Sequence, residues 1–268
     1  MMNELVCELG VLLRGWRSQR GKSQLETALA AEVSQRHLSF IESGRSVPGR
    51  EKLLAIAEAL DVPLRNRNAL LLAAGYAPLY PEQAWDAPQM RAITAAAERM
   101  LKQQEPYPAV LLDRHWNVLA ANGAAPRFFG CFVDLAEWSQ PRNLLQLIFD
   151  PAGLRPFIHD WDQVARSLLD RVRREAIGRV LDKTLQGLVD TLLAYPGVPD
   201  AVEHRSDSTD MPMIPIGFVK DGAILRYFSM VTSVGAPTAV AAQELRIECL
   251  FPADEETERG HLRTPSVP

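Results

Sequence analysis

Apolar residues recur with a helical period in the first part of the chain. Leu5, Leu9 and Leu12 are three or four residues apart. Because one helical turn takes about 3.6 residues, these side chains share one face of a helix. The spacing predicts an amphipathic helix over residues 3–20 that ends at Gly21.

Local capping signals divide the next residues into short helices. Ser23 and Glu26 fit the capping box, in which a serine and a glutamate three residues later satisfy free amides of the first turn. Ser34 is suited to cap a third helix, which stops at Gly44. Two further helices, separated by a proline, are predicted over residues 50–75.

The pattern changes after the fifth predicted helix. Residues 76–88 are rich in proline and aromatic residues and are typical of a linker, and the helical period returns over 89–105. We therefore assign residues 1–77 to an all-α domain of five helices, and residues 78–105 to a linker and a connecting helix.

Strand patterns dominate the second half of the chain. They are clearest in four segments: 107–122, 213–220, 223–233 and 243–251. Residues 220–222 predict a hairpin between two of these strands, and a long helical stretch is predicted from about 156 to 194. The prediction is an α+β domain with an antiparallel sheet over 106–253, followed by a polar, frayed tail over 254–268.

Composition favours a soluble intracellular protein. No run approaches the ~18 apolar residues that a spanning helix needs, and the N-terminal residues have no basic leader typical of a secretion signal. The three cysteines, Cys7, Cys131 and Cys249, are widely spaced and odd in number. They predict neither a disulfide framework nor a metal site, so we expect a cytoplasmic location without membrane partners.

Charge is distributed unevenly along the chain. The formal net charge is −4, which by itself argues against a nucleic-acid partner. Residues 11–50, however, hold seven Lys or Arg against three Glu, a difference of +4, whereas residues from 81 onward hold 19 basic against 25 acidic. This asymmetry indicates a DNA-facing module joined to a second part with a different function. The alternative is that the basic residues simply form a solvated face.

The third predicted helix has two different sides. Leu38 and Ile41 share an inner side. Its outer side carries mainly polar residues, with one aromatic: Gln35, at the border, then Arg36, Ser39 and Phe40. Arg and Gln can make paired hydrogen bonds to purine edges in the major groove, so the pattern favours DNA reading over a merely solvated face.

Residues 12–63 resemble the helix-turn-helix domain of the Cro and phage-repressor (XRE) family. The matching positions are Arg17, Gly21, Ser23, Gln24, Val33, Ser34, Ile41, Glu42, Gly44, Arg45 and residues 53–60. Two positions depart from the family pattern. Glu32 stands where the turn before the third helix usually has glycine, and Gly49 stands where serine often caps the fourth helix.

This resemblance implies roles for individual residues. The implied DNA-binding set is Gln24, Ser34, Gln35, Arg36, Ser39, Phe40 and Arg45. Gln24 is expected to contact a phosphate and to brace Gln35. Gln35, Arg36 and Ser39 are expected to meet base edges, and Phe40 thymine methyl groups. Arg45 is expected to hold the DNA backbone, which positions the protein without reading sequence.

The resemblance also implies a structural ion pair between Arg17 and Glu42. In the family such a pair is buried and ties the first helix to the end of the third. Removal of one partner would leave an uncompensated charge in the interior.

The remainder of the chain resembles the MmyB-like regulators. The similar segments are 59–80, 105–122, 192–197 and 248–257, so the likeness extends to about residue 257. In that family an XRE domain precedes a PAS-like ligand-binding domain. The resemblance implies an antiparallel sheet packed by helices and a pocket able to hold a fatty-acid-like molecule.

Candidate ligand residues lie on the predicted strands and their turns. They are Leu112, Trp116, Asn117, Asn122, Phe228 and Met230. Alternating apolar residues also occur in any half-buried sheet, and Asn117 can equally shape a turn. Basic residues over 171–179 could meet a carboxylate head, with solvated helix charges as the alternative.

Enzyme motifs are absent from the sequence, including G-x-S-x-G, G-x-G-x-x-G, H-E-x-x-H and the P-loop. His115 or His159 as a haem ligand is disfavoured against an ordinary satisfied histidine. We expect no catalytic residue, metal or cofactor. The predicted function is a homodimeric, ligand-responsive regulator that binds double-stranded DNA. The alternatives are an interaction adaptor that has lost DNA binding, and a monomer that pairs only on DNA.

Overall fold

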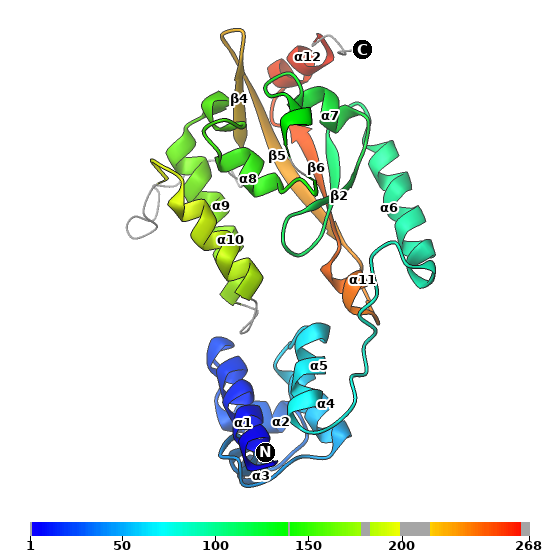
Figure 1. Ribbon diagram of the computed structural model, residues 1–268, viewed down its shortest axis with the longest axis vertical. Coiled ribbons are helices and arrows are strands. Elements are labelled where there is room, and N and C mark those ends of the chain that lie inside the picture. The colour runs from blue at the N-terminus through cyan, green and yellow to red at the C-terminus, as the bar shows by residue number, and fades with distance from the viewer. Residues whose placement is uncertain (1, 139, 178–182, 199–214, 264–268) are drawn as a thin grey trace. The chain divides into compact units, whose positions relative to one another are not determined.

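The computed structural model describes residues 2–138, 140–177, 183–198 and 215–263 (Figure 1). The chain divides into two compact units, one formed chiefly by residues up to 84 and the other chiefly by residues from 85 onward. No helix in the described residues is long and apolar enough to cross a membrane.

The first unit contains the five predicted helices in the predicted order. They are α1 (Met2–Gln19), α2 (Gln24–Ala30), α3 (Gln35–Glu42), α4 (Arg50–Ala59) and α5 (Leu64–Ala73). Their inward faces form one core around Trp16, with Leu13, Leu38, Ile41 and Ile56 fully buried beside it. The all-α prediction for this part of the chain is confirmed.

The capping signals act as the sequence predicts. The Glu26 amide donates to Ser23 Oγ at 3.1 Å, and the Ser23 amide donates to Glu26 Oε2 at 2.7 Å, which completes the capping box. Ser34 Oγ accepts from the His37 amide at 3.1 Å. Gly44, at φ +71°, follows α3 in the left-handed conformation that glycine adopts without steric cost.

The two departures from the family pattern are accommodated locally. Glu32 adopts φ +54°, so the turn between α2 and α3 keeps a left-handed residue although it has no glycine. Its side chain is exposed to solvent and therefore does not clash with the interior. Gly49 precedes α4 with no side-chain cap.

The second unit is built on a six-stranded antiparallel sheet with the order β2-β1-β6-β5-β4-β3. The strands are β1 (Ala109–Leu112), β2 (Val118–Ala121), β3 (Ile158–His159), β4 (Ile216–Lys220), β5 (Ala223–Ser233) and β6 (Arg246–Pro252). The predicted α+β class and antiparallel sheet are confirmed. Asp221 and Gly222, at φ +50° and +80°, form the predicted two-residue hairpin turn.

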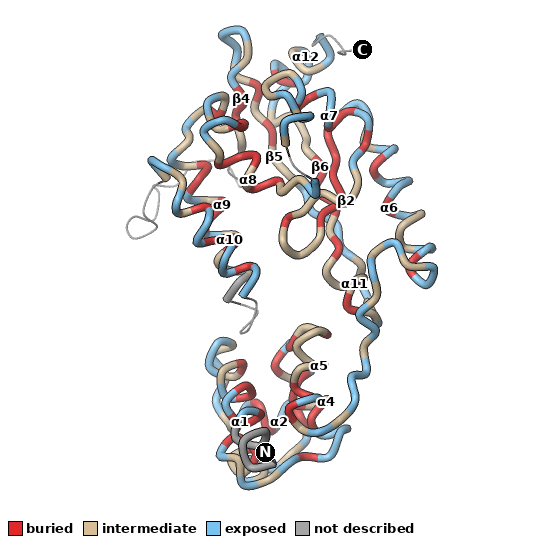
Figure 2. The backbone as a smooth tube through the Cα atoms, viewed as in Figure 1, coloured by how far each residue is buried: buried red, intermediate tan, exposed pale blue. Residues whose placement is uncertain are grey.

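Helices cover both faces of this sheet. They are α6 (Arg91–Gln103), α7 (Ala124–Phe129), α8 (Leu144–Phe149), α9 (Trp161–Ile177), α10 (Lys183–Ala194) and α12 (Glu255–Arg263). A short helix α11 (Val240–Glu244) leads into β6, and single 3-10 turns lie at Pro88–Met90, Leu135–Glu137 and Arg155–Phe157. Buried positions concentrate on α8 and on the central strands (Figure 2).

Helix α6, which the sequence analysis placed in the connecting segment, packs in the second unit. Ala97 and Leu101 are its buried residues, and it contacts β1 and β6. Exposed Ala92 and Ala96 lie one turn apart on the same helix.

The prediction of one helical stretch from residue 156 was wrong at its start. Ile158 and His159 form an edge strand paired with β4, and Asp160 turns the chain at φ +52° before α9 begins at Trp161. Strand pairing across the fold overrides the local helical pattern here. Residues 178–182 of the predicted stretch lie outside the described residues.

The expectation of a frayed tail over 254–268 was wrong for residues 255–263, whereas residues 264–268 lie outside the described residues. Residues 255–263 form α12, which packs beside β5 (Figure 1). Thr257 is fully buried, and its Oγ1 accepts from the Arg226 amide at 2.9 Å. The charges of α12 also match the helix dipole, with acidic residues in the first turn and His261 and Arg263 in the last. Local charge and tertiary contact therefore both stabilise this helix.

The first prediction concerns the closest approach of α1 to α3. A Cβ on Gly10 would lie 2.5 Å from the Glu42 carbonyl oxygen and 2.9 Å from that of Ile41, so Gly10→Ala must push these helices apart. We expect a loss of at least about 1–3 kcal/mol in the free energy of unfolding. Chemical denaturation followed by circular dichroism measures it.

The control for this substitution is Gly187→Ala in α10, where nothing lies within 4 Å of an added Cβ. That variant should gain roughly 0.5–1 kcal/mol, because alanine is the better helix former. Equal stability of Gly10→Ala and the natural protein would contradict the described packing.

Candidate functional site

The outer side of α3 presents the residues predicted to contact DNA. Ser34, Gln35 and Arg36 are exposed, and Ser39 and Phe40 are half-buried at the edge of the helix. Burial of Leu38 and Ile41 fixes the rotation of the helix about its own axis. The polar side therefore faces away from the core, as the sequence pattern indicates.

Phe40 lies close to two arginines. The Arg36 guanidinium carbon is 5.3 Å from the centre of the Phe40 ring, and that of Arg45 is 5.9 Å from it. Both distances are within the range of a cation–π attraction. Arg36, Phe40 and Arg45 therefore form one outward cluster with two positive charges.

The basic residues of the first unit divide into two groups. Arg20 Nε donates to the Leu60 carbonyl at 3.0 Å, and Lys22 Nζ donates to that of Ala59 at 2.5 Å, so both satisfy the end of α4. Arg17 takes part in the ion pair described next. Within residues 11–52, the exposed basic residues are Arg14, Arg36, Arg45, Arg50 and Lys52.

A buried carboxylate at the end of α3 joins this helix to α1 and α2. Arg17 Nε and Nη2, from α1, donate to Glu42 Oε1 and Oε2 at 2.7 and 3.0 Å. Gln24 Nε2, from α2, donates to Oε2 at 2.8 Å, and Arg14 Nη2 donates to the Glu42 carbonyl at 2.9 Å. The Glu42 side chain is only 1% exposed.

Charge and hydrogen bonding keep this carboxylate ionised. Burial by itself raises the pKa of Glu42, but hydrogen bonds from Arg17 and Gln24 and the charges of Arg17 and Arg14 outweigh it and hold the pKa below its usual value. The amide of Gln24 contacts Glu42, so the expected brace onto Gln35 is replaced by a third bond to the buried carboxylate. Sequence reasoning missed this role of Gln24.

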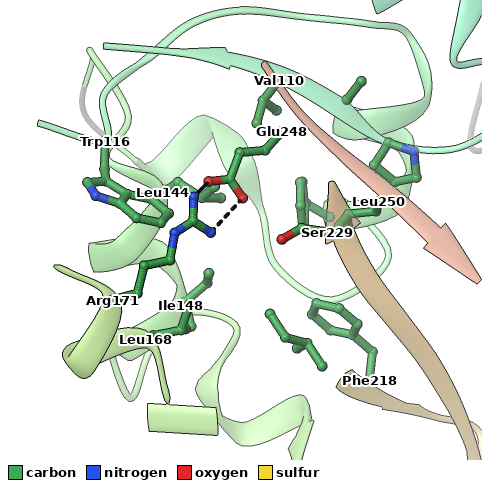
Figure 3. Close-up of a pocket in the computed structure, with 14 residues that line it drawn as sticks. Val110, Trp116, Leu144, Ile148, Leu168, Arg171, Phe218, Ser229, Glu248 and Leu250 are labelled. Atoms are coloured by element: carbon green, nitrogen blue, oxygen red, sulfur yellow. Dashed lines mark hydrogen bonds and ion pairs between the residues drawn. The ribbon is translucent and has the colours of Figure 1, made fainter. Parts of the chain in front are cut away.

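An apolar cavity lies in the second unit between the sheet and helices α8 and α9 (Figure 3). Its apolar walls include Val110, Phe129, Leu144, Ile148, Leu168, Phe218 and Leu250. The cavity has a volume of about 50 Å³ and is partly open to solvent. It is therefore small and lined mainly by carbon.

Polar groups gather at one place on the cavity wall. Arg171, from α9, donates through Nη1 to Glu248 Oε2 at 3.3 Å, and its Nη2 forms a shorter contact with Oε1. Figure 3 shows these two side chains pointing toward one another beside Trp116, with Ser229 lining the same cavity. The Arg171 guanidinium carbon lies 4.6 Å from the centre of the Trp116 ring, and that of Arg246 lies 4.0 Å from it.

Of the six candidate ligand residues, Trp116 lies on the cavity wall. Asn117 and Asn122 do not line it. Asn122 Oδ1 accepts from the Ala109 and Ala125 amides, and its Nδ2 donates to the Tyr107 carbonyl. Asn117 Nδ2 donates to Asp113. Both asparagines therefore shape turns next to strands and do not line this cavity.

Phe228 and Met230 do not line this cavity, because of the geometry of β5. Successive side chains of a strand point to opposite faces, and Ser229 points into the cavity. Phe228 stacks on Phe251 at 5.6 Å between ring centres, and Met230 is 57% exposed. Leu112 is fully buried but does not line the cavity either.

Sequence reasoning missed Ser229 and Glu248 as residues of this cavity, and it included Arg171 only among the basic residues over 171–179. The alternation of side chains along β5 was the available signal, because it places Tyr227 and Ser229 on one face of the sheet and Phe228 and Met230 on the other. Nothing in the local pattern distinguishes the face with the cavity from the other face. Arg171 is one of the basic residues over 171–179, which the sequence offers as possible partners of a carboxylate head.

Comparison with known families agrees with both units. Residues 13–65 match the model of a helix-turn-helix family, and residues 93–262 match that of the MmyB-like transcription regulator ligand binding domain. The second match spans more than half of the chain. The chain belongs to the MmyB-like transcription regulators. These are families of transcription regulators and not of enzymes.

Individual relatives resemble the N-terminal part of this MmyB-like protein. Transcriptional regulator ClgR of Mycobacterium tuberculosis, in strains CDC 1551 and H37Rv, is 43% identical over 75 residues, which is 28% of this chain. The match spans 64% of the length of those relatives. The crystal structure of the clp gene regulator ClgR from Corynebacterium glutamicum is 26% identical over 38% of this chain and 95% of that one, with a TM-score of 0.24.

The second prediction concerns the buried ion pair. Glu42→Gln leaves the Arg17 guanidinium without its charge partner, and we expect a loss of about 3–5 kcal/mol in the free energy of unfolding. Because the folded pKa of Glu42 is lowered, its stabilising contribution is complete above the ordinary value of 4.5 and is lost as the pH falls through the folded pKa. Denaturant melts over a pH series measure both effects.

The matched control is Glu58→Gln on the exposed side of α4, which should change stability by no more than about 0.5 kcal/mol. If both variants show the same stability and the same pH dependence, Glu42 does not connect the helices as described.

Proposed function

We propose that this protein is a sequence-specific DNA-binding transcriptional regulator whose second unit binds a small apolar ligand. The observation that carries the first half is the outward side of α3, where exposed Gln35 and Arg36 stand on a helix fixed by a buried core. An α-helix fits the major groove, and these side chains can pair with purine edges. The similarity to regulators named ClgR supports the same assignment.

The two arginines of the outward cluster have different roles in this proposal. Arg36 is on the helix and reads a base edge together with Gln35 and Ser39. Arg45 lies beyond the end of α3 and holds a phosphate, and Ser34 and Gln24 contact the DNA backbone at the helix starts. Phe40 lies between the arginines and meets thymine methyl groups through its exposed edge.

The adaptor alternative assigns the same surface to a protein partner. It does not require exposed arginines beside a helix that carries Gln35. A DNA-reading helix does require them, because phosphate contacts supply much of the affinity and base contacts supply the specificity. The outward cluster therefore favours DNA.

The cavity in the second unit supports an apolar ligand of small cross-section. Its walls are apolar except at Arg171, Ser229 and Glu248, and its width suits a single alkyl or acyl chain better than a ring system. A fatty-acid-like chain, as the family resemblance implies, meets these conditions. A ligand that binds one arrangement of the protein better than another can then shift its activity on DNA.

The third prediction separates base reading from backbone holding. Arg36→Ala should weaken binding to the preferred operator, selected from random duplexes, by about 1–3 kcal/mol and relax its specificity. Arg45→Ala should weaken binding to all duplexes alike and reduce the salt slope by about one. Fluorescence anisotropy over a salt series measures both.

Lys102→Ala, at an exposed position of α6, is the control that should leave DNA binding unchanged. Equal losses for Arg36→Ala and Arg45→Ala on operator and random DNA would contradict base reading by Arg36. Unchanged binding in both variants would favour the adaptor.

The fourth prediction concerns assembly. One recognition helix reads only a few base pairs, and regulators of this type bind two half-sites about 34 Å apart, so we propose a homodimer. Helix α6 is the proposed contact, since Ala92 and Ala96 are exposed and small and stand beside a groove with Ile93. Native mass spectrometry should show a dimer, and Ala96→Glu should shift it to monomer.

Lys102→Glu places a glutamate on a different face of α6 from Ala92 and Ala96 and should leave the dimer intact. A monomer in the natural protein at micromolar concentration would support pairing only on DNA. The same spectra report any ligand that the protein retains after purification.

A further inference from the structure

The cavity between the sheet and helices α8 and α9 has one charged end. Arg171 and Glu248 are the charged residues that line it, and Arg246 lies beside them with its Nε 3.9 Å from Glu248 Oε1. Two guanidinium groups and one carboxylate give this end a net charge of +1. A chain with a polar or anionic head group therefore binds with its head at this end and its apolar part along the remaining walls.

Strand register places Phe218 far from the charged end. Glu248 of β6 pairs with Val231 of β5, and Phe218 of β4 pairs with Leu225 of the same β5 strand. Directly paired residues share a face of the sheet, and both Glu248 and Phe218 line the cavity. Val231 and Leu225 are six residues apart, which is about 20 Å along the strand. Figure 3 shows Phe218 on the opposite side of the cavity from the ion pair of Arg171 and Glu248.

Aromatic rings from three other segments hold Phe218 in place. The centre of its ring lies 5.1 Å from that of Phe128 on α7, 5.5 Å from that of Phe132 and 6.1 Å from that of Tyr227 on β5. Tyr227 is fully buried, and its hydroxyl oxygen lies 2.7 Å from Nδ1 of His261 on α12. Phe218 itself is 2% exposed. Displacement of its ring would therefore disturb a packed cluster and not a single neighbour.

The long walls of the cavity consist of more adaptable side chains. Ile148, Leu168 and Leu250 are aliphatic and can change rotamer. The cavity of about 50 Å³ is small beside the roughly 150 Å³ that accommodates benzene in a protein core, so a chain enters only as wall residues move. The aliphatic walls yield more readily than the aromatic end, and the chain extends along the cavity toward Phe218.

We propose that Phe218 is the length stop of this cavity, which sets the longest acyl or alkyl chain that binds with its head at the charged end. This inference rests on the proposed ligand site. Each additional methylene that becomes buried raises affinity about fourfold. The gain continues until the end of the chain meets the Phe218 ring, and methylenes beyond that length stay in water or fold back and add nothing.

The test is a series of saturated fatty acids, from octanoate to octadecanoate, bound to the full-length protein. Equilibrium dialysis below the concentration of micelle formation gives the dissociation constant of each acid. We expect affinity to rise about fourfold per methylene among the shorter acids and to stop rising at a limiting length. A steady rise through octadecanoate would overturn the inference.

Substitution of the ring assigns the limit to its source. Phe218→Ala should move the limit to longer acids, and acids just beyond the natural limit should gain about fourfold for each methylene that the new space buries. Phe218→Leu, a milder change, should move the limit in the same direction by less. Phe251→Ala is the matched control, because the Phe251 ring stacks on Phe228 and does not line the cavity. It should keep the natural limit.

The outcomes distinguish this inference from the ligand site itself. If no acid binds the natural protein, the proposed ligand site fails and this inference fails with it. If the acids bind with a limit that neither Phe218 variant moves, or that Phe251→Ala moves equally, the site stands and the length stop is overturned. Circular dichroism checks the fold of each variant, and if Phe218→Ala does not fold, the limit of Phe218→Leu decides.

Discussion

The buried carboxylate of Glu42 is the constraint on which the DNA-facing unit depends. It is the last residue of α3, and it takes hydrogen bonds from Arg17 on α1 and Gln24 on α2. A buried charge is stable only when its partners are in place, so the three helices must meet at one geometry. That geometry, together with the close approach at Gly10, sets which side of α3 faces outward.

A second buried carboxylate, Glu248, has a comparable ion pair in a different setting. Glu42 is enclosed by helices, and its hydrogen bonds are all made within the helix-turn-helix unit. Glu248 also pairs with an arginine, but it stands on the wall of a cavity. The first ion pair connects three helices, whereas the second presents charge to an apolar cavity. The chemistry is the same, and the neighbouring space decides the role.

Burial also changes the meaning of the basic charge near the N-terminus. The sequence shows an excess of +4 over residues 11–50, from seven basic against three acidic residues. Arg17 donates hydrogen bonds to Glu42, and Arg20 and Lys22 donate hydrogen bonds to the carbonyls at the end of α4. Fewer of these charges are therefore left for a partner than composition indicates, and Arg36 and Arg45 are among those that remain exposed.

The sequence by itself determined the five helices, the antiparallel α+β class and the outward side of α3, because caps at Ser23 and Ser34, glycine stops and apolar periods act over a few residues. It also indicated Trp116. Only the tertiary structure decided that Glu248, Arg171 and Ser229 share a cavity while Phe228 and Met230 face away. A period of two separates the faces of a strand but does not say which face is covered by which helix, and that depends on contacts between residues far apart in the chain.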